Sequence, residues 1–374
     1  MANATYRLFF NHIPASREQL DRVAEITVEQ EVDMAWEAHI RMPIHTDDRG
    51  IWTGEDEAFM ADFIPVRVEV RVGEGDFVPL LDGPLVGIEH HLSSEPGQSQ
   101  MTLRVQDDSV WLNRDDRLFC FENLLDHEIA SQLFAEAAQI VSTDIDKTPA
   151  PTSPLTPVVV QRGTAMQLLR SLARRQGLHA YLLPGAKPGQ SVGCFKAFPM
   201  QPDGLPPLIV VGSDRNVAEL APSYDAQKPT RMTAYALSIT DKSLTRRTAE
   251  FGNLNRLGQE TTFQTEAQTG SQVMYPEYGD SVDLDQWVTA ETLRSSYAFQ
   301  ARGKVLDRYY TGVLSPYRVV TVTGANHRLS GDYLITHVTH TLSHSRYSQS
   351  FTLQRNARSQ GANTGLANLV EKIF

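Results

Sequence analysis

Alternating apolar and polar positions dominate the first third of the chain. Between residues 66 and 72 every second position is valine, separated by arginine and glutamate, and residues 34–42 alternate in the same way. A period of two is typical of strands that bury one face. Gly73–Asp76 supply a turn and apolar residues resume at once, so a hairpin is predicted there. The first 115 residues are therefore predicted to be mainly β.

The apolar spacing becomes helical after about residue 120. Apolar residues at 130, 133, 134, 137, 140 and 141 share one helical face, and this predicted helix leads into a proline-rich connector over residues 148–157. A second helix is predicted from Thr164, which forms a capping box with Gln167, to a stop at Gly177. The apolar stretches that follow predict a hairpin, so this region is predicted to be a small α/β domain.

Beyond residue 230, strand patterns surround a polar insert. Residues 232–239 have a strand pattern, about sixty residues rich in Thr, Gln and Gly follow, and a helix is predicted near 287–301. Strands are predicted again from residue 313. The end of the chain carries an apolar stripe at helical spacing, formed by Leu366, Leu369, Val370, Ile373 and Phe374. A stripe of this kind is expected to be buried against another surface.

Two segments far apart in the chain resemble each other. At an offset of 250 residues, 331–356 repeats features of 82–106. The matched pairs are Asp82 and Asp332, Ile88 and Val338, His90 and His340, Leu92 and Leu342, Ser93 and Ser343, Thr102 and Thr352, and Leu103 and Leu353. The chain is therefore predicted to contain one β unit twice. Two copies per chain favour a protein that builds a ring from few subunits, which is a structural rather than a catalytic role.

Composition and charge argue against several classes of partner. The 374 residues allow two to four domains. With 34 basic and 45 acidic residues the net charge is −11, which disfavours stable binding to nucleic acid or to an anionic membrane. Cys120 and Cys194 have no neighbouring cysteine, so a reducing compartment is expected. The N-terminus lacks a secretory signal and no apolar stretch could span a bilayer, so cytoplasmic synthesis is expected.

Candidate catalytic and metal-binding residues give weak signals. His337, His340 and His344 are close in sequence, but the first two point to opposite faces of a strand and no cysteine or carboxylate shares their spacing. Ordinary strand histidines are the preferred interpretation, as for His90 and His91. The Gly-x-Gly of the hairpin turn lacks the third glycine and the helix of a nucleotide site, and no nucleophile elbow or His-Glu-x-x-His is present. No enzyme activity, cofactor or metal is predicted.

The C-terminal repeat carries a family resemblance. From residue 312 to 356 the chain has a glycine before a strand, a glycine-containing turn, Ser-Gly-x-Tyr, Val-x-His and a closing strand that ends in arginine. This order resembles the baseplate hub proteins of contractile phage tails, the late control D family, and the hub part of VgrG spikes. Residues 161–185 are similar to a second signature of that family. The matching positions are Gly312, Gly324, Ser330, Gly331, Tyr333, Val338, His340, Phe351, Leu353 and Arg355.

The resemblance implies a mainly β fold with an α+β insert: two tail-tube-like antiparallel β-barrels per chain plus a small α/β domain. The implied domains are a first barrel (1–115), the α/β domain (116–210), a split second barrel (211–245 and 300–357), a polar insert with a helix (246–299) and a helical tail (358–374). Hub proteins of this family assemble as homotrimers, so three chains would present six barrels between a sixfold tail tube and a threefold spike. Unlike VgrG, the chain ends soon after the hub signature, so a separate trimeric spike protein is expected.

The implied partners are sister subunits, the spike, the tail tube protein and other baseplate proteins of an assembled phage tail or injection particle. The sequence does not distinguish among phages, phage-tail-like bacteriocins and other injection systems. The apolar tail stripe is the candidate contact with a sister subunit or the spike. Acidic residues at 47, 48 and 55–57 are predicted to form a solvated loop, with a lumen-facing role as the alternative. The rival function is a glycan-acting or peptidoglycan-degrading baseplate component, for which only the polar residues 245–286 leave room.

Overall fold

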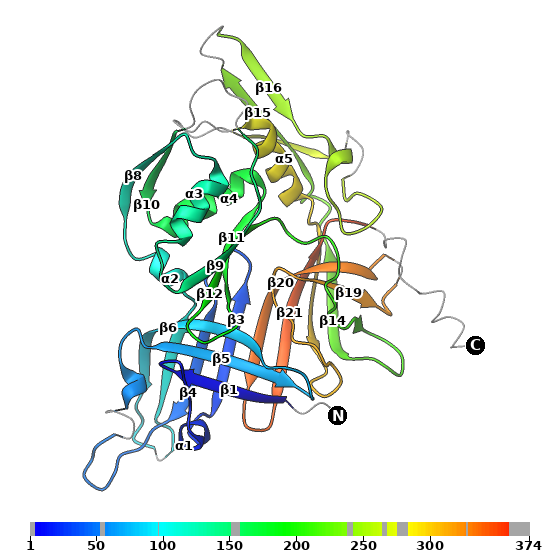
Figure 1. The fold of residues 1–374 in the computed structure, drawn as a ribbon. Helices are drawn as coiled ribbons and strands as arrows, with labels where there is room; N and C mark the ends of the chain where they lie inside the picture. The colour runs from blue at the N-terminus through cyan, green and yellow to red at the C-terminus, as the bar shows by residue number, and fades with distance from the viewer. Residues whose placement is uncertain are drawn as a thin grey trace.

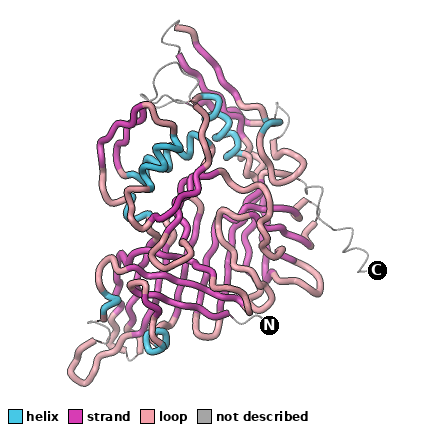
Figure 2. The backbone as a smooth tube through the Cα atoms, in the orientation of Figure 1, coloured by secondary structure: helices cyan, strands magenta, loops and turns pink. Residues whose placement is uncertain are grey.

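The computed structural model describes residues 4–52, 57–95, 97–150, 158–237, 242–263, 268–274, 283–326 and 328–358. Most strands gather in the lower half of Figure 1, and the longer helices lie above them beside smaller sheets, as Figure 2 also shows. The five apolar residues of the tail, part of the acidic loop and most of the proline-rich connector lie outside the described residues. The predicted fold class, mainly β with an α+β part, is confirmed.

One sheet of 13 strands contains two sets of six strands, which we call unit 1 and unit 2. Unit 1 consists of β1 (Ala4–Phe10), β3 (Glu25–Glu31), β4 (Glu37–Pro43), β5 (Pro65–Val72), β6 (Val78–His91) and β7 (Gln100–Gln106). Unit 2 consists of β13 (Leu208–Ile209), β14 (Val217–Tyr224), β18 (Phe299–Val305), β19 (Val319–Thr323), β20 (Gly331–Leu342) and β21 (Tyr347–Arg355). Short elements attached to unit 1 are β2 (Ile13–Pro14), α1 (Arg17–Asp21), η1 (Ala58–Met60) and α2 (Ser109–Leu112).

The strands of unit 1 bury their apolar side chains in one core. In β4 and β7 every second residue is buried, as the alternation predicts. Strand β5 differs, because residues 66–70 are buried on both faces. Its valines enter the core of unit 1. On the other face Arg67 is covered by the α/β part of the chain, and Glu69 is buried beside Arg67 and pairs with it. Sequence alternation alone assigned these two charged side chains to solvent.

The α/β part confirms one predicted helix and corrects another. Its elements are β8 (Arg117–Glu122), α3 (Asp126–Phe134), β9 (Ile140–Ile145), β10 (Val158–Gly163), α4 (Ala165–Gln176), β11 (His179–Pro184) and β12 (Ser191–Lys196). The Thr164 hydroxyl caps α4 and Gly177 ends it in a left-handed conformation, as predicted. The helix predicted over 130–141 is wrong at its end, because α3 stops at Phe134 and residues 140–141 belong to β9. Parallel pairing of β9 with β12 overrides the local helical spacing.

The insert within unit 2 is a small folded layer. It comprises β15 (Thr230–Leu237), β16 (Leu244–Thr248), η2 (Phe251–Asn253), β17 (Gly270–Met274) and α5 (Leu284–Ser295). Strand β15 was expected in the second barrel, but it pairs with β16 and β17 in a separate sheet. The helix predicted to reach residue 301 ends earlier, since Ala301 lies in β18. Unit 2 is therefore interrupted between Tyr224 and Phe299, which is earlier in the chain than expected.

Candidate assembly site

The two units have the same strand order. In unit 1 the neighbours run β3, β4, β7, β6, β5, β1, and in unit 2 they run β14, β18, β21, β20, β19, β13. If the six strands of each unit are numbered 1 to 6 in chain order, their order across the sheet is 2, 3, 6, 5, 4, 1 in both units. The units differ at their first strand, because β1 lies antiparallel to β5 whereas β13 lies parallel to β19. The structure thus supports the repeat seen in the sequence and extends it from one hairpin to six strands.

Details of the paired hairpins confirm the offset of 250 residues for β6 and β20. The offset is 248 for β7 and β21, because Ile88 lies opposite Leu103 whereas the equivalent Val338 lies opposite Phe351, so the pairs Thr102 and Thr352 and Leu103 and Leu353 are not equivalent. The β6–β7 ladder shifts register between Leu85 and Gly87, and the β20–β21 ladder shifts at the equivalent place, between Ile335 and His337. Asp82 lies opposite Arg67 across β6 and β5, and the equivalent Asp332 lies opposite Thr321 across β20 and β19. Both aspartates accept a hydrogen bond from that cross-strand partner. Bulges are specific local features, so a shared bulge is strong support for equivalence.

Strand β20 joins the two units. Its first half, from Gly331 to Leu334, pairs with β19 of unit 2, and its second half, from His337 to Leu342, pairs with β3 of unit 1. The orange β20 and blue β3 lie side by side in Figure 1. The same strand therefore completes unit 2 and presents an edge on which unit 1 is assembled. This in-chain junction shows how the two units of this chain pair with each other.

His340 lies at the centre of the junction and is completely buried. Its Nδ1 is 2.9 Å from the Tyr347 hydroxyl and its Nε2 is 3.2 Å from the Gln30 Oε1 atom. The Gln30 amide nitrogen donates to the Leu80 carbonyl oxygen at 2.7 Å, so the amide oxygen faces the imidazole. Nε2 is therefore the donor, Nδ1 accepts from Tyr347, and the ring is neutral. Burial lowers the pKa of His340 to about 3.

The remaining motif residues of the resemblance build the end of unit 2. Arg355 is buried without a carboxylate partner among the described residues. It donates to the carbonyl oxygen of Ser330 at 2.8 Å and to that of Arg328, and its guanidinium lies 4.6 Å from the Tyr333 ring centre. Gly331 begins β20 with φ of 135°, which favours glycine. The motif therefore shapes the turn before β20, while Val338, His340 and Leu353 are buried farther along the hairpin.

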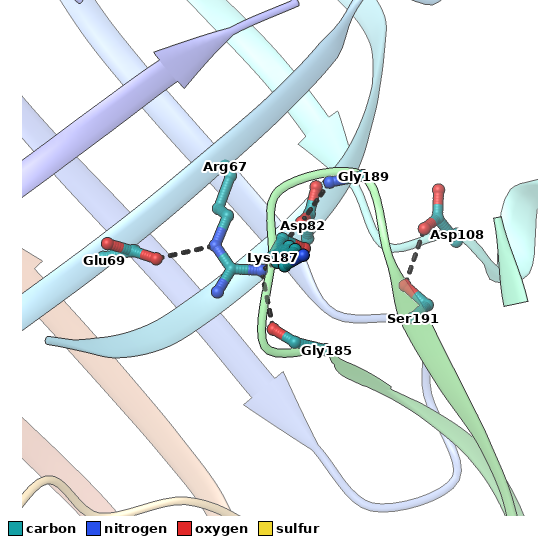
Figure 3. A network of polar contacts seen from close by, with 8 residues as sticks. All are labelled: Arg67, Glu69, Asp82, Asp108, Gly185, Lys187, Gly189 and Ser191. Carbon is teal, nitrogen blue, oxygen red and sulfur yellow. Dashed lines mark hydrogen bonds and ion pairs between the residues drawn. The ribbon is translucent and has the colours of Figure 1, made fainter. Parts of the chain in front are cut away.

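A buried ionic cluster clasps the α/β part onto unit 1 (Figure 3). The Arg67 guanidinium donates to Glu69 at 2.8 Å and to Asp82 at 2.9 Å, and the three residues are 2%, 7% and 2% exposed. Arg67 also donates to the carbonyl oxygens of Gly185 and Lys187, in the turn between β11 and β12, at 2.9 and 3.2 Å. Nothing in the sequence indicates this clasp beyond a charged residue at an alternating strand position.

Asp108 makes a second buried contact with the same hairpin. Its carboxylate accepts a hydrogen bond of 2.6 Å from the Ser191 hydroxyl and one of 3.1 Å from the Trp111 indole nitrogen. Burial, assisted by the negative charges of Asp82 and Asp107, raises the pKa of Asp108 to about 6 even though these hydrogen bonds oppose the shift. At neutral pH the folded protein therefore keeps the Asp108 carboxylate ionised in a buried position, which costs stability.

Asp108→Asn is expected to stabilise the protein at pH 8. The folded-state pKa lies above the ordinary value of 3.8, so the wild type loses stability as pH rises from about 4 to 6 and the uncharged variant does not. We expect a gain of roughly 1–3 kcal/mol in unfolding free energy at pH 8, reduced by any lost hydrogen bond, and little gain at pH 4.5. Urea unfolding at both pH values measures it. Asp115→Asn, at an exposed position nearby, is the control and should change neither value; an equal effect of D108N at both pH values would contradict the assignment.

Among the described residues no group of three or more His, Cys, Asp or Glu side chains could hold a metal ion. His337 and His340 are not brought together, since the first is half-buried on one side of the strand and the second is in the core. No helix within the described part of the chain is long and apolar enough to cross a membrane. The proposed tail contact residues lie outside the described residues.

Solved structures with the same fold come from phage tails and from type VI secretion. A tail protein of Neisseria meningitidis matches with a TM-score of 0.62 at 14% identity, over 96% of this chain and 98% of that one. The 43 kDa tail protein of prophage MuSo2 from Shewanella oneidensis matches with a TM-score of 0.63 at 13% identity, over 94% and 98%. A type VI secretion component of Escherichia coli, reported to be structurally similar to the bacteriophage T4 tail proteins gp27 and gp5, gives 0.53 at 13% identity, over 97% and 80%.

No protein-family model and no curated protein matches the chain. At these low identities the matches establish the fold: the chain has the architecture of phage tail proteins and of a type VI secretion component, over nearly its whole length.

Proposed function

We propose that this protein is a structural baseplate hub of a contractile injection machine, of the late control D type. In this role three copies form a ring of six similar units that adapts a sixfold tail tube to a threefold spike. The observation that carries the proposal is the six-strand unit present twice in one chain, with the two copies joined edge to edge by β20 and β3. The fold shared with phage tail and type VI secretion proteins supports the same role.

The proposed partners follow from this role. They are two further copies of the chain, a separate spike, the tail tube and other baseplate proteins, in an assembled phage tail or injection particle. In this role units 1 and 2 would form the ring, and the α/β part would lie beside unit 1, held by its contacts with Arg67. The tail stripe remains the candidate contact with the spike or a sister subunit.

A mass measurement tests the proposal. Light scattering of the purified protein, with and without the spike protein, is expected to give about 125 kDa per hub, three times the 41.7 kDa chain, with the trimer favoured when the spike is present. The expectation rests on the ring geometry, in which each chain supplies two of six units. A protein that keeps the mass of a single chain under both conditions contradicts the trimer and the adaptor role.

The rival, glycan-acting function receives no support from the carboxylates nearest a cavity. A cavity of about 600 Å³ lies between the units and the α/β part and is lined by Glu31, Asp33, His179 and Arg294. Burial acts to raise the pKa of Asp33, but the hydrogen bond and charge of His179, together with the charges of Arg294 and Arg170, outweigh it and lower that pKa. A general acid for glycoside cleavage requires the opposite shift. A peptidoglycan-clearing assay in which the protein is active would overturn the structural role.

A further inference from the structure

Strands β15 and β16 form a hairpin that extends past the α/β part at the top of Figure 1, and we call it the projecting hairpin. Strand β17 pairs with one side of β15, and β16 is an outer strand of this three-stranded sheet. Among the described residues no strand pairs with the outer side of β16. The hairpin therefore presents a strand edge whose main-chain groups are open to another chain.

Helix α5 covers one face of this sheet. The Arg247 guanidinium lies 3.1 Å from the carboxylate of Asp285, at the start of α5. Ala234 lies opposite Arg247 in the β15–β16 ladder, so it points to the same face, and it is completely buried. The helix therefore packs on the face that carries Ala234 and Arg247.

The opposite face carries exposed apolar side chains. Tyr235, Leu244 and Val273 are 37%, 67% and 40% exposed. Tyr235 lies opposite Arg246 across the ladder, and Leu244 precedes Arg246 by two residues, so these side chains share one face. Val273 of β17 lies beside Thr233, two residues before Tyr235, and therefore points the same way. Apolar side chains that gather uncovered on one face of a sheet indicate a contact surface.

The projecting hairpin is basic within an acidic protein. Residues 228–248 contain five basic residues and one acidic residue, whereas the whole chain has a net charge of −11. Lys242 and Arg246 are exposed, and within the described part of the chain neither forms an ion pair. Arg247 differs, because Asp285 balances its charge on the α5 side. Leu244 is therefore flanked, at alternate positions, by two cations without an anionic partner.

We propose that the projecting hairpin binds an acidic, extended segment of a partner protein, which adds to the free edge of β16 and places carboxylates beside Lys242 and Arg246. Main-chain hydrogen bonds to the edge supply affinity, and the neighbouring side chains supply specificity. Positive charges on the edge oppose pairing between two copies of the hairpin, and the same charges attract an acidic strand. This surface is additional to the proposed hub role and does not depend on it.

A protein segment matches the projecting hairpin better than a nucleic acid does. The free edge of β16 offers main-chain donors and acceptors in the spacing of another strand, and Leu244 needs an apolar partner between the two cations. The net charge of −11 also opposes a polyanion as large as a nucleic acid. A short segment with two carboxylates is attracted by Lys242 and Arg246 with little repulsion from the rest of the molecule.

A labelled peptide tests the proposal. The sequence Glu-Thr-Leu-Thr-Glu has a carboxylate on each side of an apolar residue at alternate positions, which matches the spacing of Lys242, Leu244 and Arg246 in either strand direction. Its binding to the full chain, measured by fluorescence anisotropy, is expected to be saturable. The affinity should fall by about tenfold when salt is raised from about 0.05 M to about 0.5 M, because the attracting charges are exposed.

A charge swap identifies the surface. Lys242→Glu with Arg246→Glu is expected to weaken binding of the glutamate peptide by about tenfold or more and to create binding of Lys-Thr-Leu-Thr-Lys, which wild type should not bind. Arg162→Glu is the matched control, since Arg162 is an exposed arginine on β10, in a separate two-stranded sheet. The control should bind as wild type does. All three side chains are exposed, so the melting temperatures should stay at the wild-type value.

The remaining outcomes overturn the proposal. A glutamate peptide that shows no saturable binding, or that binds the swapped variant as tightly as wild type, excludes the β16 edge as its site. Tighter binding of a short DNA duplex, lost in the swapped variant, identifies a nucleic-acid surface and overturns the acidic protein partner. Light scattering of the same samples keeps the hub role separate: a trimer that does not bind the peptide contradicts this surface alone, and a monomer that binds it contradicts the hub alone.

Discussion

Arg67→Met is expected to destabilise the protein by about 3–5 kcal/mol, because it removes one partner of a buried ionic cluster and leaves the carboxylates of Glu69 and Asp82 uncompensated. Methionine fills a similar volume, so the effect isolates the charge and its hydrogen bonds. Burial already raises the pKa of Asp82 despite the nearby guanidinium. Without Arg67, Asp82 would be forced further toward its neutral form. Urea unfolding at pH 7, followed by tryptophan fluorescence, measures the loss.

The same substitution should also loosen the clasp locally. Arg67 holds the carbonyl oxygens of Gly185 and Lys187, so the turn between β11 and β12 loses its attachment to unit 1. Pro188 follows Lys187 and blocks trypsin at that bond, so subtilisin, which has broad specificity, is the protease of choice. Its cleavage within residues 185–190 is expected to accelerate well before global unfolding. This second measurement distinguishes a lost domain contact from a general loss of stability.

Arg71→Met is the matched control for this prediction. Arg71 lies on the same strand near its end, half-buried, with its guanidinium 4.7 Å from the Phe77 ring centre, so its loss should cost about 1 kcal/mol or less. Adding Glu69→Gln and Asp82→Asn to the Arg67 variant should recover part of the stability, because fewer buried charges are then left unpaired. Equal effects of the Arg67 and Arg71 substitutions would contradict the clasp.

The sequence predicted those helices and turns whose formation depends on residues close together in the chain. The capping box of Thr164 and Gln167 and the stop at Gly177 define α4 through atoms within a few residues of each other. The valine alternation of β5 and the turn after it likewise predict a hairpin. The internal repeat could also be predicted from the sequence, because strands in equivalent positions of two similar units pack against similar neighbours.

Features that depend on contacts between distant segments of the chain could not be predicted from the sequence. Residues 140–141 fit a helical face, yet they form β9 because β12, about fifty residues later, supplies a strand to pair with. Strand β15 has the pattern of a strand, and the pattern does not say which sheet it joins. Arg67 is indistinguishable in sequence from Arg71, and only the covering hairpin makes it buried. Gln30, which links His340 to unit 1, was missed for the same reason.

His90 and His340 occupy equivalent strands of the two units but differ in burial. His340 is in the core because β3 covers its edge, whereas His90 is exposed at the free edge of β6. The backbone ladders around the two residues match, so the difference in burial comes from the neighbour and not from the strand.

Acidification is expected to weaken the protein through His340. The pKa of this buried ring lies at about 3, while an unfolded chain protonates histidine near 6.5. Because the unfolded state binds the proton first, stability is present above pH 6.5 and is lost as pH falls toward 3. The loss attributable to this one ring is about 2–3 kcal/mol at pH 4.5 and about 4–5 kcal/mol at pH 3. Asp108, whose pKa is raised to about 6, acts in the opposite direction between pH 6 and 4, so the net slope of the wild type is shallower than the His340 contribution alone.

Comparison of wild type with His340→Gln isolates this contribution. Glutamine can keep one of the hydrogen bonds to Gln30 or Tyr347 and does not titrate, so the variant is expected to be less stable at pH 7.5 and to lose less on acidification. The difference between the two proteins in unfolding free energy should shrink by roughly 2–3 kcal/mol between pH 7.5 and 4.5. His344→Gln, in the exposed turn after β20, is the control and should follow the wild-type curve. Parallel curves for wild type and the His340 variant would show that the ring takes up its proton at the same pH in the folded and unfolded protein, and would contradict the neutral hydrogen-bond chain that joins the two units.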